Sequence, residues 1–390
     1  MEAVTPFLEV TEAIKELGGQ DLERCMQCAV CTGVCPWNLV RYFSPRGMIR
    51  LAQFGLEGFE SEDLWRCVTC NKCVINCPRG LPIIDIFRAM RIMMNETGSI
   101  PPSLKGPIGS ASNRGNPWSG APGARTSWTE GLDVEPFSSR RDYLFFTCCT
   151  QAYEARNQKA GRALLRLLQA GGVDFGIMEE GEVCCGDAVR KMGAEEVFCK
   201  LAETNLGLFE ERGVERIIVA SPHCYNAFVK DYPRVGGGSY LVRHYTEVVE
   251  ELLDQGRLTP KRELGKRVTY HDPCYLGRHN GIYDAPRRVL RAVPGLELVE
   301  MPRNREDSLC CGGGGGGLWN EVPAEERFAV LRVEEALETG AEVIAAACPY
   351  CIIMFEDALK TLGKEEELRV ADIAELVFES LDDEAGPSEG

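Results

Sequence analysis

Two short runs near the N-terminus carry cysteines at the spacing typical of iron–sulfur clusters. Both follow the pattern C-x2-C-x2-C-x3-C-P, the first ending at Cys35-Pro36 and the second at Cys77-Pro78. Three thiolates of one such loop can bind three irons of a [4Fe–4S] cube, while the proline turns the fourth cysteine away. In two-cluster proteins that fourth cysteine binds the other cube. We therefore predict a first N-terminal set of Cys25, Cys28, Cys31 and Cys77, and a second N-terminal set of Cys67, Cys70, Cys73 and Cys35.

Zinc is the main alternative for a four-cysteine set. Zinc sites also use four thiolates, but they rarely take all four from a segment as short as 25–35. Two adjacent iron–sulfur cubes have one obvious use, which is to pass single electrons between a donor and an acceptor. The N-terminal region is therefore predicted to be an electron-transfer domain rather than a zinc domain.

The C-terminal half carries two further series of cysteines with matching intervals. In each series a cysteine is followed 36 residues later by a Cys-Cys-Gly triplet, which begins at Cys184 in the first and at Cys310 in the second. Two neighbouring thiolates cannot easily bind one iron, so a Cys-Cys pair favours bridging or adjacent irons. Buried thiols without a metal are the weaker interpretation, because packing does not require the repeated intervals. The first-lobe series is Cys148, Cys149, Cys184, Cys185 and Cys224, and the second-lobe series is Cys274, Cys310, Cys311, Cys348 and Cys351.

The two series differ at one position of the repeat. Ser221 of the first stands where Cys348 stands in the second. A serine hydroxyl is a far poorer iron ligand than a thiolate near neutral pH, because it is so rarely ionised. Three outcomes stay open for the first lobe: a differently ligated cluster, a cluster that recruits Cys149, or no cluster.

Three histidines lie close in sequence to these cysteines, namely His223, His271 and His279. Each could deliver protons to a reduced substrate or tune a cluster, although a structural histidine is the commoner case. They are the only catalytic candidates. The glycine run Gly312–Gly317 lacks the Gly-Lys-Ser/Thr ending of a phosphate loop, so we expect its backbone N–H groups to approach cluster sulfides instead.

Short β-branched runs precede the C-terminal cysteines and alternate with helical candidates such as 155–169 and 324–338. This alternation is typical of parallel strands joined by crossover helices. Cysteines that follow such strands gather at the strand carboxyl ends, where open α/β sheets place their sites. The expected strands are 143–146, 217–220, 267–270 and 343–347.

Composition divides the chain into three regions, and the internal repeat divides the last region into two lobes. The segments 42–59 and 83–94 of the first part are expected to be helical. Proline and glycine pairs are expected to break regular structure in the second part, which should pack along a domain surface because it contains Trp118 and Trp128. We predict an α+β multi-domain protein: an α-helical domain over 1–96, a connector over 97–141, and two tandem α/β lobes over 142–262 and 263–390, related by the internal repeat.

Composition also limits the environment and the partners. The chain has 390 residues and 19 cysteines, an odd number that no complete disulfide framework can use. Its formal net charge of −16 argues against nucleic acid as a partner. No charged-then-apolar leader opens the chain, and no apolar run approaches the ~20 residues of a membrane helix. We expect a cytoplasmic protein that does not insert into a membrane and meets one only through a partner subunit.

The complete pattern resembles the heterodisulfide reductase family in its fused, D-type subunit. The second-lobe series resembles the family's cysteine-rich "CCG" domain, and Cys35-Pro36-Trp37 with Ser44-Pro45-Arg46 resembles its ferredoxin subunit. Iron–sulfur subunits of sulfite-reduction membrane complexes and of class II benzoyl-CoA reductase are similar. The resemblance implies an α-helical ferredoxin domain followed by two CCG lobes. It also implies that the second-lobe series holds a non-cubane [4Fe–4S] cluster and that the first-lobe series is a second candidate site.

The resemblance also guides the expected function. An electron-transfer subunit of an anaerobic redox complex is the leading expectation, with partners that are flavin-containing or membrane cytochrome subunits. The alternative is a catalytic subunit that reduces a heterodisulfide or a related disulfide at the non-cubane cluster. The degenerate first lobe weakens this alternative, because the family's disulfide chemistry uses two such clusters that face one substrate.

Overall fold

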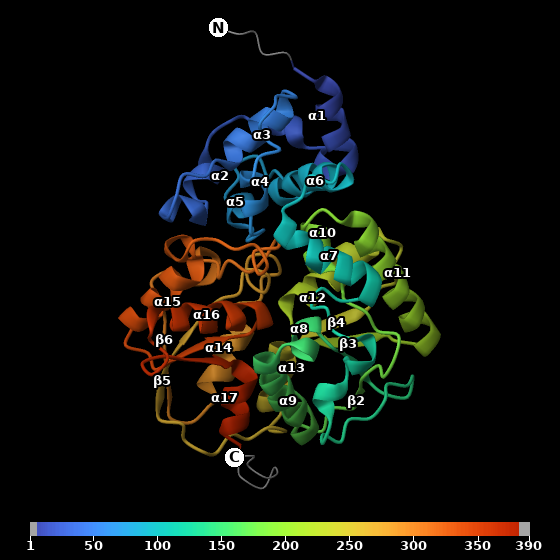
Figure 1. Cartoon of the computed structure of the whole chain (residues 1–390). Helices are drawn as coiled ribbons and strands as arrows, with labels where there is room; N and C mark the ends of the chain where they lie inside the picture. Colours follow the sequence, from blue (N-terminus) through green and yellow to red (C-terminus); the bar gives the residue numbers. More distant parts are fainter. Residues whose placement is uncertain (1–5, 382–390) are drawn as a thin grey trace.

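Short helices of the N-terminal region lie together at one end of the molecule, above two α/β lobes that stand side by side (Figure 1). The computed structural model describes residues 6–381, so the outermost parts of the first and last predicted domains, 1–5 and 382–390, lie outside the described residues. The N-terminal helices are α1 (Leu8–Ile14), α2 (Val30–Gly33), α3 (Pro45–Gln53), α4 (Asp63–Arg66), α5 (Lys72–Ile75) and α6 (Ile83–Glu96).

Helix α3 is shorter than the predicted helical segment 42–59. Ser44 caps its start by accepting a hydrogen bond from the Gly47 N–H at 3.0 Å, and Pro45 takes the first helical position. Gly55 follows the helix with a φ of 58°, a left-handed conformation that stops helical propagation. The prediction was therefore right in type and wrong in extent, whereas α6 matches the predicted 83–94 closely.

The connector is more regular than its composition predicts. Helix α7 (Pro102–Arg114) runs through Gly106-Pro107, which we expected to break regular structure. Its buried residues follow the helical spacing i, i+3, i+4 and i+7, and this apolar stripe outweighs the proline. Beyond α7, Trp128 is buried and Trp118 packs against Trp319 with ring centroids 5.8 Å apart. The stripe consists of Leu104, Pro107, Ile108 and Ala111.

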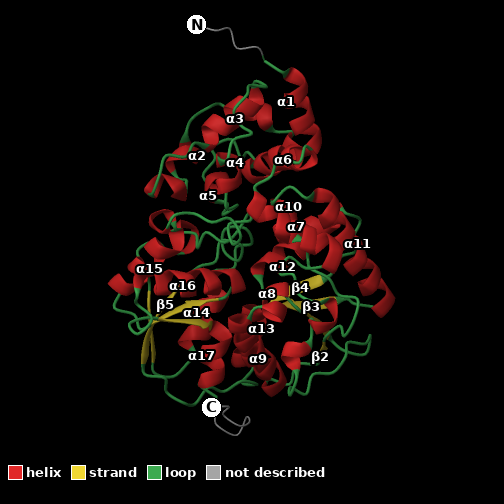
Figure 2. Cartoon of the chain, in the orientation of Figure 1, coloured by secondary structure: helices red, strands yellow, loops and turns green. Residues whose placement is uncertain are grey.

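Each lobe contains a four-stranded parallel sheet, and the two sheets have the same strand order. Figure 2 shows strands in both lobes with helices packed around them. The first sheet runs β2-β1-β3-β4 and the second runs β6-β5-β7-β8. The identical topology confirms the internal repeat and the predicted fold class. The strands are β1 (Tyr143–Phe146), β2 (Phe175–Gly176), β3 (Arg216–Val219), β4 (Leu241–His244), β5 (Lys266–Tyr270), β6 (Leu296–Val299), β7 (Val343–Ala346) and β8 (Arg369–Asp372).

Helices join the lobes around a pseudo-two-fold arrangement. Helix α9 (Ala155–Ala170) packs on α17 (Ile373–Glu379), and α14 (Asp284–Arg291) packs on α13 (Tyr245–Asp254). In both pairs the crossover helix after the first strand of one lobe meets the last helix of the other. The remaining helices are α8 (Cys149–Tyr153), α10 (Asp187–Lys191), α11 (Glu195–Arg212), α12 (Pro222–Asn226), α15 (Phe328–Glu338) and α16 (Pro349–Leu362).

Two helix predictions in the lobes have different outcomes. The predicted helix 155–169 is α9 almost to the residue. The predicted helix 324–338 is divided: a short 3-10 turn, Ala324–Glu326, precedes α15, and Arg327 between them has an extended backbone. The division leaves the strand order and the position of the cysteines unchanged.

Candidate metal centres

The second N-terminal set lines one small cavity in the N-terminal domain. Cys35 comes from the first run, while Cys67, Cys70 and Cys73 come from the second. Burial, together with the neighbouring thiols of Cys70 and Cys67, raises the pKa of Cys35. Cys70 is buried and the other three are half-buried, and four such neighbouring thiols cannot ionise together without a compensating cation, which the irons of a cluster would supply. The cavity therefore fits a cluster at this set, and the ligand role of the four cysteines stays a prediction.

The first N-terminal set lies nearer to solvent. Burial raises the pKa of Cys31, and the thiols of Cys25 and Cys28 beside it add to this effect. Cys28 is exposed, whereas Cys25 and Cys77 are half-buried. Cys77 follows α5, which packs on α2, the helix that carries Cys31. The structure thus gathers three members of this set in one loop and places Cys77 beyond the neighbouring helix.

The second-lobe series lies buried after β5, β6 and β7, close to the carboxyl ends of the strands. The Sγ atoms of Cys274 and Cys310 are 3.9 Å apart, and those of Cys311 and Cys351 are 3.3 Å apart. Two thiolates bound at about 2.3 Å to one tetrahedral metal stand about 3.8 Å apart, so both pairs are near the separation of metal ligands. The Gly312 N–H lies 3.3 Å from Cys310 Sγ, so the glycine run does bring backbone to sulfur.

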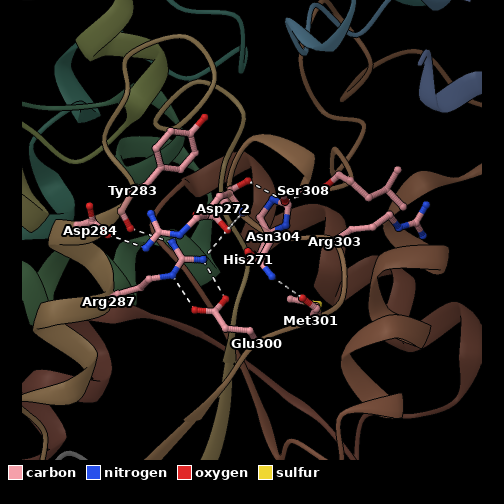
Figure 3. Close-up of polar contacts among 12 residues, drawn as sticks. His271, Asp272, Tyr283, Asp284, Arg287, Glu300, Met301, Arg303, Asn304 and Ser308 are labelled. Carbon is pink, nitrogen blue, oxygen red and sulfur yellow. Dashed lines mark hydrogen bonds and ion pairs between the residues drawn. The ribbon is translucent and has the colours of Figure 1, made fainter. Parts of the chain in front are cut away.

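A buried ion-pair network fixes the loop that carries Cys274 (Figure 3). Arg287 is 1% exposed and donates to both carboxylate oxygens of Asp272, at 2.7 and 2.8 Å, and to both of Glu300, at 2.7 and 2.9 Å. Asp272 also accepts the Arg305 backbone N–H at 2.7 Å. Because Asp272 lies two residues before Cys274, this bidentate pairing holds the cysteine at the end of β5.

The first-lobe series is buried too, and Cys149 lies within it. Contacts between thiols join Cys148 to Cys224, Cys224 to Cys185, and Cys184 to Cys149. All five are less than one-tenth exposed. The structure therefore brings together five thiols in this lobe, as many as in the second.

Two polar residues distinguish the first lobe. The buried Ser221 hydroxyl accepts the His223 N–H at 3.3 Å and caps α12, so it serves the helix rather than the thiols. Arg125 of the connector donates to Cys149 Sγ at 3.4 Å and to Glu182 Oε1 at 2.9 Å. A guanidinium is thus in place beside the thiol that has no counterpart in the second lobe, where Tyr275 follows Cys274.

Each lobe places one side chain toward the thiols of the other. His223 lies beside Cys348 of the second lobe, and Tyr350 lies within electrostatic reach of Cys184 in the first. The two residues occupy equivalent positions of the repeat, and their rings are 4.6 Å apart. Burial lowers the pKa of His223, but Asp187, 2.7 Å from its Nδ1, and Cys348 raise it to about 10. Each lobe therefore contributes one ring to the thiol series of the other: the first lobe contributes a protonated imidazole, and the second contributes a phenol.

The second N-terminal set faces the second-lobe series directly. The thiol of Cys310 lies beside that of Cys70 and is the largest cause of the raised pKa of Cys70. Arg278, 7% exposed, donates to the carbonyls of Cys70 at 2.7 Å and of Ser308 at 2.6 Å, so it joins the two loops. This contact brings the predicted N-terminal electron carrier to the edge of the C-terminal site.

Arg91 on α6 ties the N-terminal domain to both lobes. It is 1% exposed and donates to the carbonyls of Lys191 at 2.8 Å, Gly315 at 2.9 Å and Cys67 at 2.7 Å. Gly315 packs so closely that a Cβ there would lie 2.4 Å from the Cys67 carbonyl oxygen. The glycine run thus serves contact with the N-terminal domain as well as with sulfur.

The three candidate histidines lie in different surroundings. A ring nitrogen of His271 lies within 4.8 Å of the sulfur atoms of Cys311 and Cys351, and His223 lies beside Cys348. His279 instead donates through Nε2 to the Thr69 carbonyl at 2.8 Å, which is a structural role.

Sequence reasoning did not predict that two arginines bridge the domains. Arg91 and Arg278 belong to no motif and stand out in no periodic pattern. Their role depends on the docking of domains that are far apart in sequence, and no signal within one segment could have revealed it.

Comparison with known protein families supports the division into an N-terminal and a C-terminal part. A family of 4Fe-4S dicluster domains matches residues 21–81. A family described as a cysteine-rich domain matches twice, over residues 143–229 and 268–356. Each cysteine-rich match covers the first three strands of one sheet and the cysteines that follow them, and it ends before the fourth strand, β4 or β8.

Similar proteins combine the same parts. The chain is 30% identical over 417 residues to the D-type subunit of the dihydromethanophenazine:CoB–CoM heterodisulfide reductase of Methanosarcina barkeri, covering 97% of this chain and 98% of that one. It is 37% identical over 320 residues to the probable iron-sulfur-binding oxidoreductase FadF of Bacillus subtilis. It is 36% identical over 281 residues to the EtfAB:quinone oxidoreductase of Syntrophomonas wolfei. The last two matches cover 78% and 68% of this chain but only 45% and 39% of those longer proteins.

Proposed function

Because this chain belongs to the family of heterodisulfide reductase D-type subunits, we propose that it is the electron-transfer subunit of a redox complex. It would connect a partner subunit with a centre in the second lobe. When bound, [4Fe–4S] clusters supply one-electron oxidation and reduction. The two N-terminal sets would hold two [4Fe–4S] clusters, and the second-lobe series would hold a non-cubane [4Fe–4S] cluster. The chain's own contribution is to fix these sites relative to one another and to bury them.

The observation that carries this proposal is the contact between Cys70 and Cys310. One thiol belongs to the second N-terminal set and the other to the second-lobe series, and both are buried. Arg278 and Arg91 hold the surrounding loops together through backbone carbonyls. Electron transfer slows steeply with distance, so this contact favours exchange between the two sites.

Substitution of Gly315 tests that contact without removing a thiol. A methyl group in Gly315→Ala must displace the Cys67 carbonyl, whereas Gly340→Ala introduces one at a similarly positive φ where no atom lies within 4 Å. Rapid freeze-quench electron paramagnetic resonance of the anaerobic holoprotein should show slower electron exchange only for Gly315→Ala. Equal rates in wild type and both variants would argue against this route.

The first-lobe series is proposed to hold a further iron–sulfur centre in which Cys149 replaces the missing ligand at Ser221. Five buried thiols in mutual contact and the Arg125 guanidinium beside Cys149 support this assignment. Cys149→Ala should then lower the iron content by about four per chain. Cys199→Ala, on the half-buried α11 thiol outside all four groups, is the control. Full iron content in Cys149→Ala would leave the first lobe without such a centre.

The packing between the lobes favours electron transfer over direct disulfide reduction. The His223 ring stacks on Tyr275 with centroids 3.9 Å apart and lies against Tyr350 at 4.6 Å, so aromatic rings fill the space between the two thiol series. A disulfide that reacted between the lobes would have to displace them. Oxidation of the reduced chain by a heterodisulfide in the absence of partners would support the catalytic alternative instead.

A partner is expected at the exposed first N-terminal set. Cys28 is exposed there, and so are the apolar side chains of Met26, Val30 and Ile75. An apolar surface around a redox site suits a flavin-containing or membrane cytochrome subunit. No helix within residues 6–381 is long and apolar enough to cross a membrane. We propose a cytoplasmic location, with membrane association through that partner.

Isolation from the source cells under argon tests the proposed function as a whole. The chain should copurify with a flavin-containing or cytochrome subunit, and its clusters should be reduced by that partner. Zinc as the dominant metal, or isolation without any redox subunit, would overturn the proposal.

A further inference from the structure

His271 is placed to act on the second-lobe centre. It follows β5 directly, it is 0% exposed, and one of its ring nitrogens lies within 4.8 Å of the sulfur atoms of Cys311 and Cys351. Figure 3 shows its ring beside Asp272 and Ser308, within the network that holds this loop. One imidazole and two thiols are a familiar group of metal ligands, so the geometry alone allows His271 to be either a ligand or a neighbour of the centre.

Arg332 decides between these roles. Its side chain is 0% exposed, and its Nε donates to His271 Nδ1 at 3.2 Å. A guanidinium has five N–H donors and no acceptor, so Nδ1 must present its lone pair to Arg332. The single ring proton of the neutral imidazole is then on Nε2. Nε2 therefore has no lone pair with which to bind iron.

The orientation of Arg332 is itself fixed. Nη1 donates to the Arg303 carbonyl at 2.7 Å and to Glu335 at 2.7 Å, and Nη2 donates to Ser308 Oγ at 3.3 Å. With these acceptors around it, the guanidinium cannot turn away to release Nδ1. The same residues would have to rearrange before His271 could change tautomer.

The remaining N–H group has no conventional acceptor. His271 Nε2 is buried without a hydrogen-bond partner among the described residues. Leaving a buried donor unpaired costs about 1–3 kcal/mol, and such groups are rare in native proteins. Among the described residues, the sulfur atoms of Cys311 and Cys351 lie within 4.8 Å of a ring nitrogen of His271, and the Cys311 thiol is a hydrogen-bonding neighbour of the ring.

We propose that His271 is not a ligand but donates an N–H···S hydrogen bond from Nε2 to the thiolate of Cys311 or Cys351 in the second-lobe centre, with Arg332 as the positioning residue that fixes the tautomer. The proposal rests on the proposed function in one respect, which is that the second lobe binds an iron–sulfur cluster. A hydrogen bond to a cluster thiolate stabilises added negative charge and therefore raises the reduction potential.

Three variants of the full-length holoprotein test this role. His271→Leu should keep the iron content of wild type while the midpoint potential of the second-lobe centre shifts to a lower value. His271→Gln, whose amide N–H can replace Nε2–H, should restore most of the shift. Arg332→Gln should lower the midpoint potential or broaden the redox transition, because it no longer fixes the tautomer of His271. The N-terminal clusters serve as an internal reference for folding and loading.

Pulsed electron paramagnetic resonance gives a second readout that does not depend on activity. The wild type should show a weak nitrogen coupling to the second-lobe centre, and His271→Leu should lack it. A strong coupling in the wild type, or loss of iron from the second lobe alone in His271→Leu, would make His271 a ligand and overturn the proposal. An unchanged potential in His271→Leu would also overturn it. A wild-type protein with only the N-terminal clusters would instead mean that the proposed function has failed.

Discussion

Replacement of Arg91 by methionine should uncouple the N-terminal domain from the lobes. The guanidinium makes five hydrogen bonds to four backbone carbonyls, those of Leu64, Cys67, Lys191 and Gly315. Methionine has a similar volume and no donor, so four buried acceptors would lose their partner. Each unpaired carbonyl costs about 1–2 kcal/mol, and the cost of burying the charge in wild type is subtracted. The free energy of unfolding is therefore expected to fall by about 3–5 kcal/mol.

The assay is guanidinium chloride unfolding of the holoprotein under argon. Visible absorption reports on all the proposed clusters, those of the N-terminal domain included, and far-ultraviolet circular dichroism reports mainly on the sheets and helices of the two lobes. In Arg91→Met the N-terminal domain should unfold at lower denaturant than the lobes, which divides a shared transition into two. Arg91→Lys should fall between, because one ammonium cannot reach all four carbonyls.

A matched control comes from the same domain. Arg50 lies on α3 and is exposed, so Arg50→Met should unfold as wild type does. If Arg91→Met also unfolds in one transition at the wild-type midpoint, Arg91 does not hold the domains together and the reasoning from its hydrogen bonds is wrong.

Three further predictions concern the metal content, the asymmetry of the lobes and the pH dependence. Anaerobically purified protein should contain at least about eight irons per chain, measured against zinc by elemental analysis. Cys311→Ala should abolish the paramagnetic signal of the second-lobe centre while Cys185→Ala leaves it intact, and the reverse result would show that the assignment of the lobes is backwards. Burial raises the pKa of Asp372 to about 7, so its folded form favours the protonated state and its contribution to stability is lost as the pH rises through that value. Asp372→Asn should therefore make the thermal unfolding midpoint less sensitive to pH between about 4 and 7. An unchanged pH dependence would show that the pKa of Asp372 is not raised on folding.

The sequence predicts those features that depend on short intervals along the chain. Cysteine spacing was sufficient to find the repeat, because each cysteine follows a strand and equal intervals imply equal folds. The motif also predicted that Cys35 of the first run is grouped with the second run, and in the structure Cys35 lines the same cavity as the cysteines of that run. Apolar spacing could have revealed α7, but the prolines and glycines of the connector were given more weight than the stripe from Leu104 to Ala111.

The features that the sequence did not predict are contacts between residues that are far apart in the chain. The donor from Arg332 to His271 joins residues 61 positions apart, and the contact between Arg91 and Gly315 joins residues 224 positions apart. The first contact depends on how α15 packs beside the end of β5 within the second lobe, and the second depends on the angle at which the N-terminal domain docks on the lobes. Such an angle is set by the sum of many weak contacts, and no local pattern encodes it.

The reciprocal placement of His223 and Tyr350 has a consequence for how the two lobes have diverged. If the repeat arose by duplication, each copy came to complete the surroundings of the other, so neither could change its residue at this position without altering its sister's pocket. Substitutions at 223 and 350 are therefore expected to covary among relatives. The difference between Ser221 and Cys348 lies beside this pair, so any divergence in function between the two lobes would involve the residues that each lobe contributes to the other.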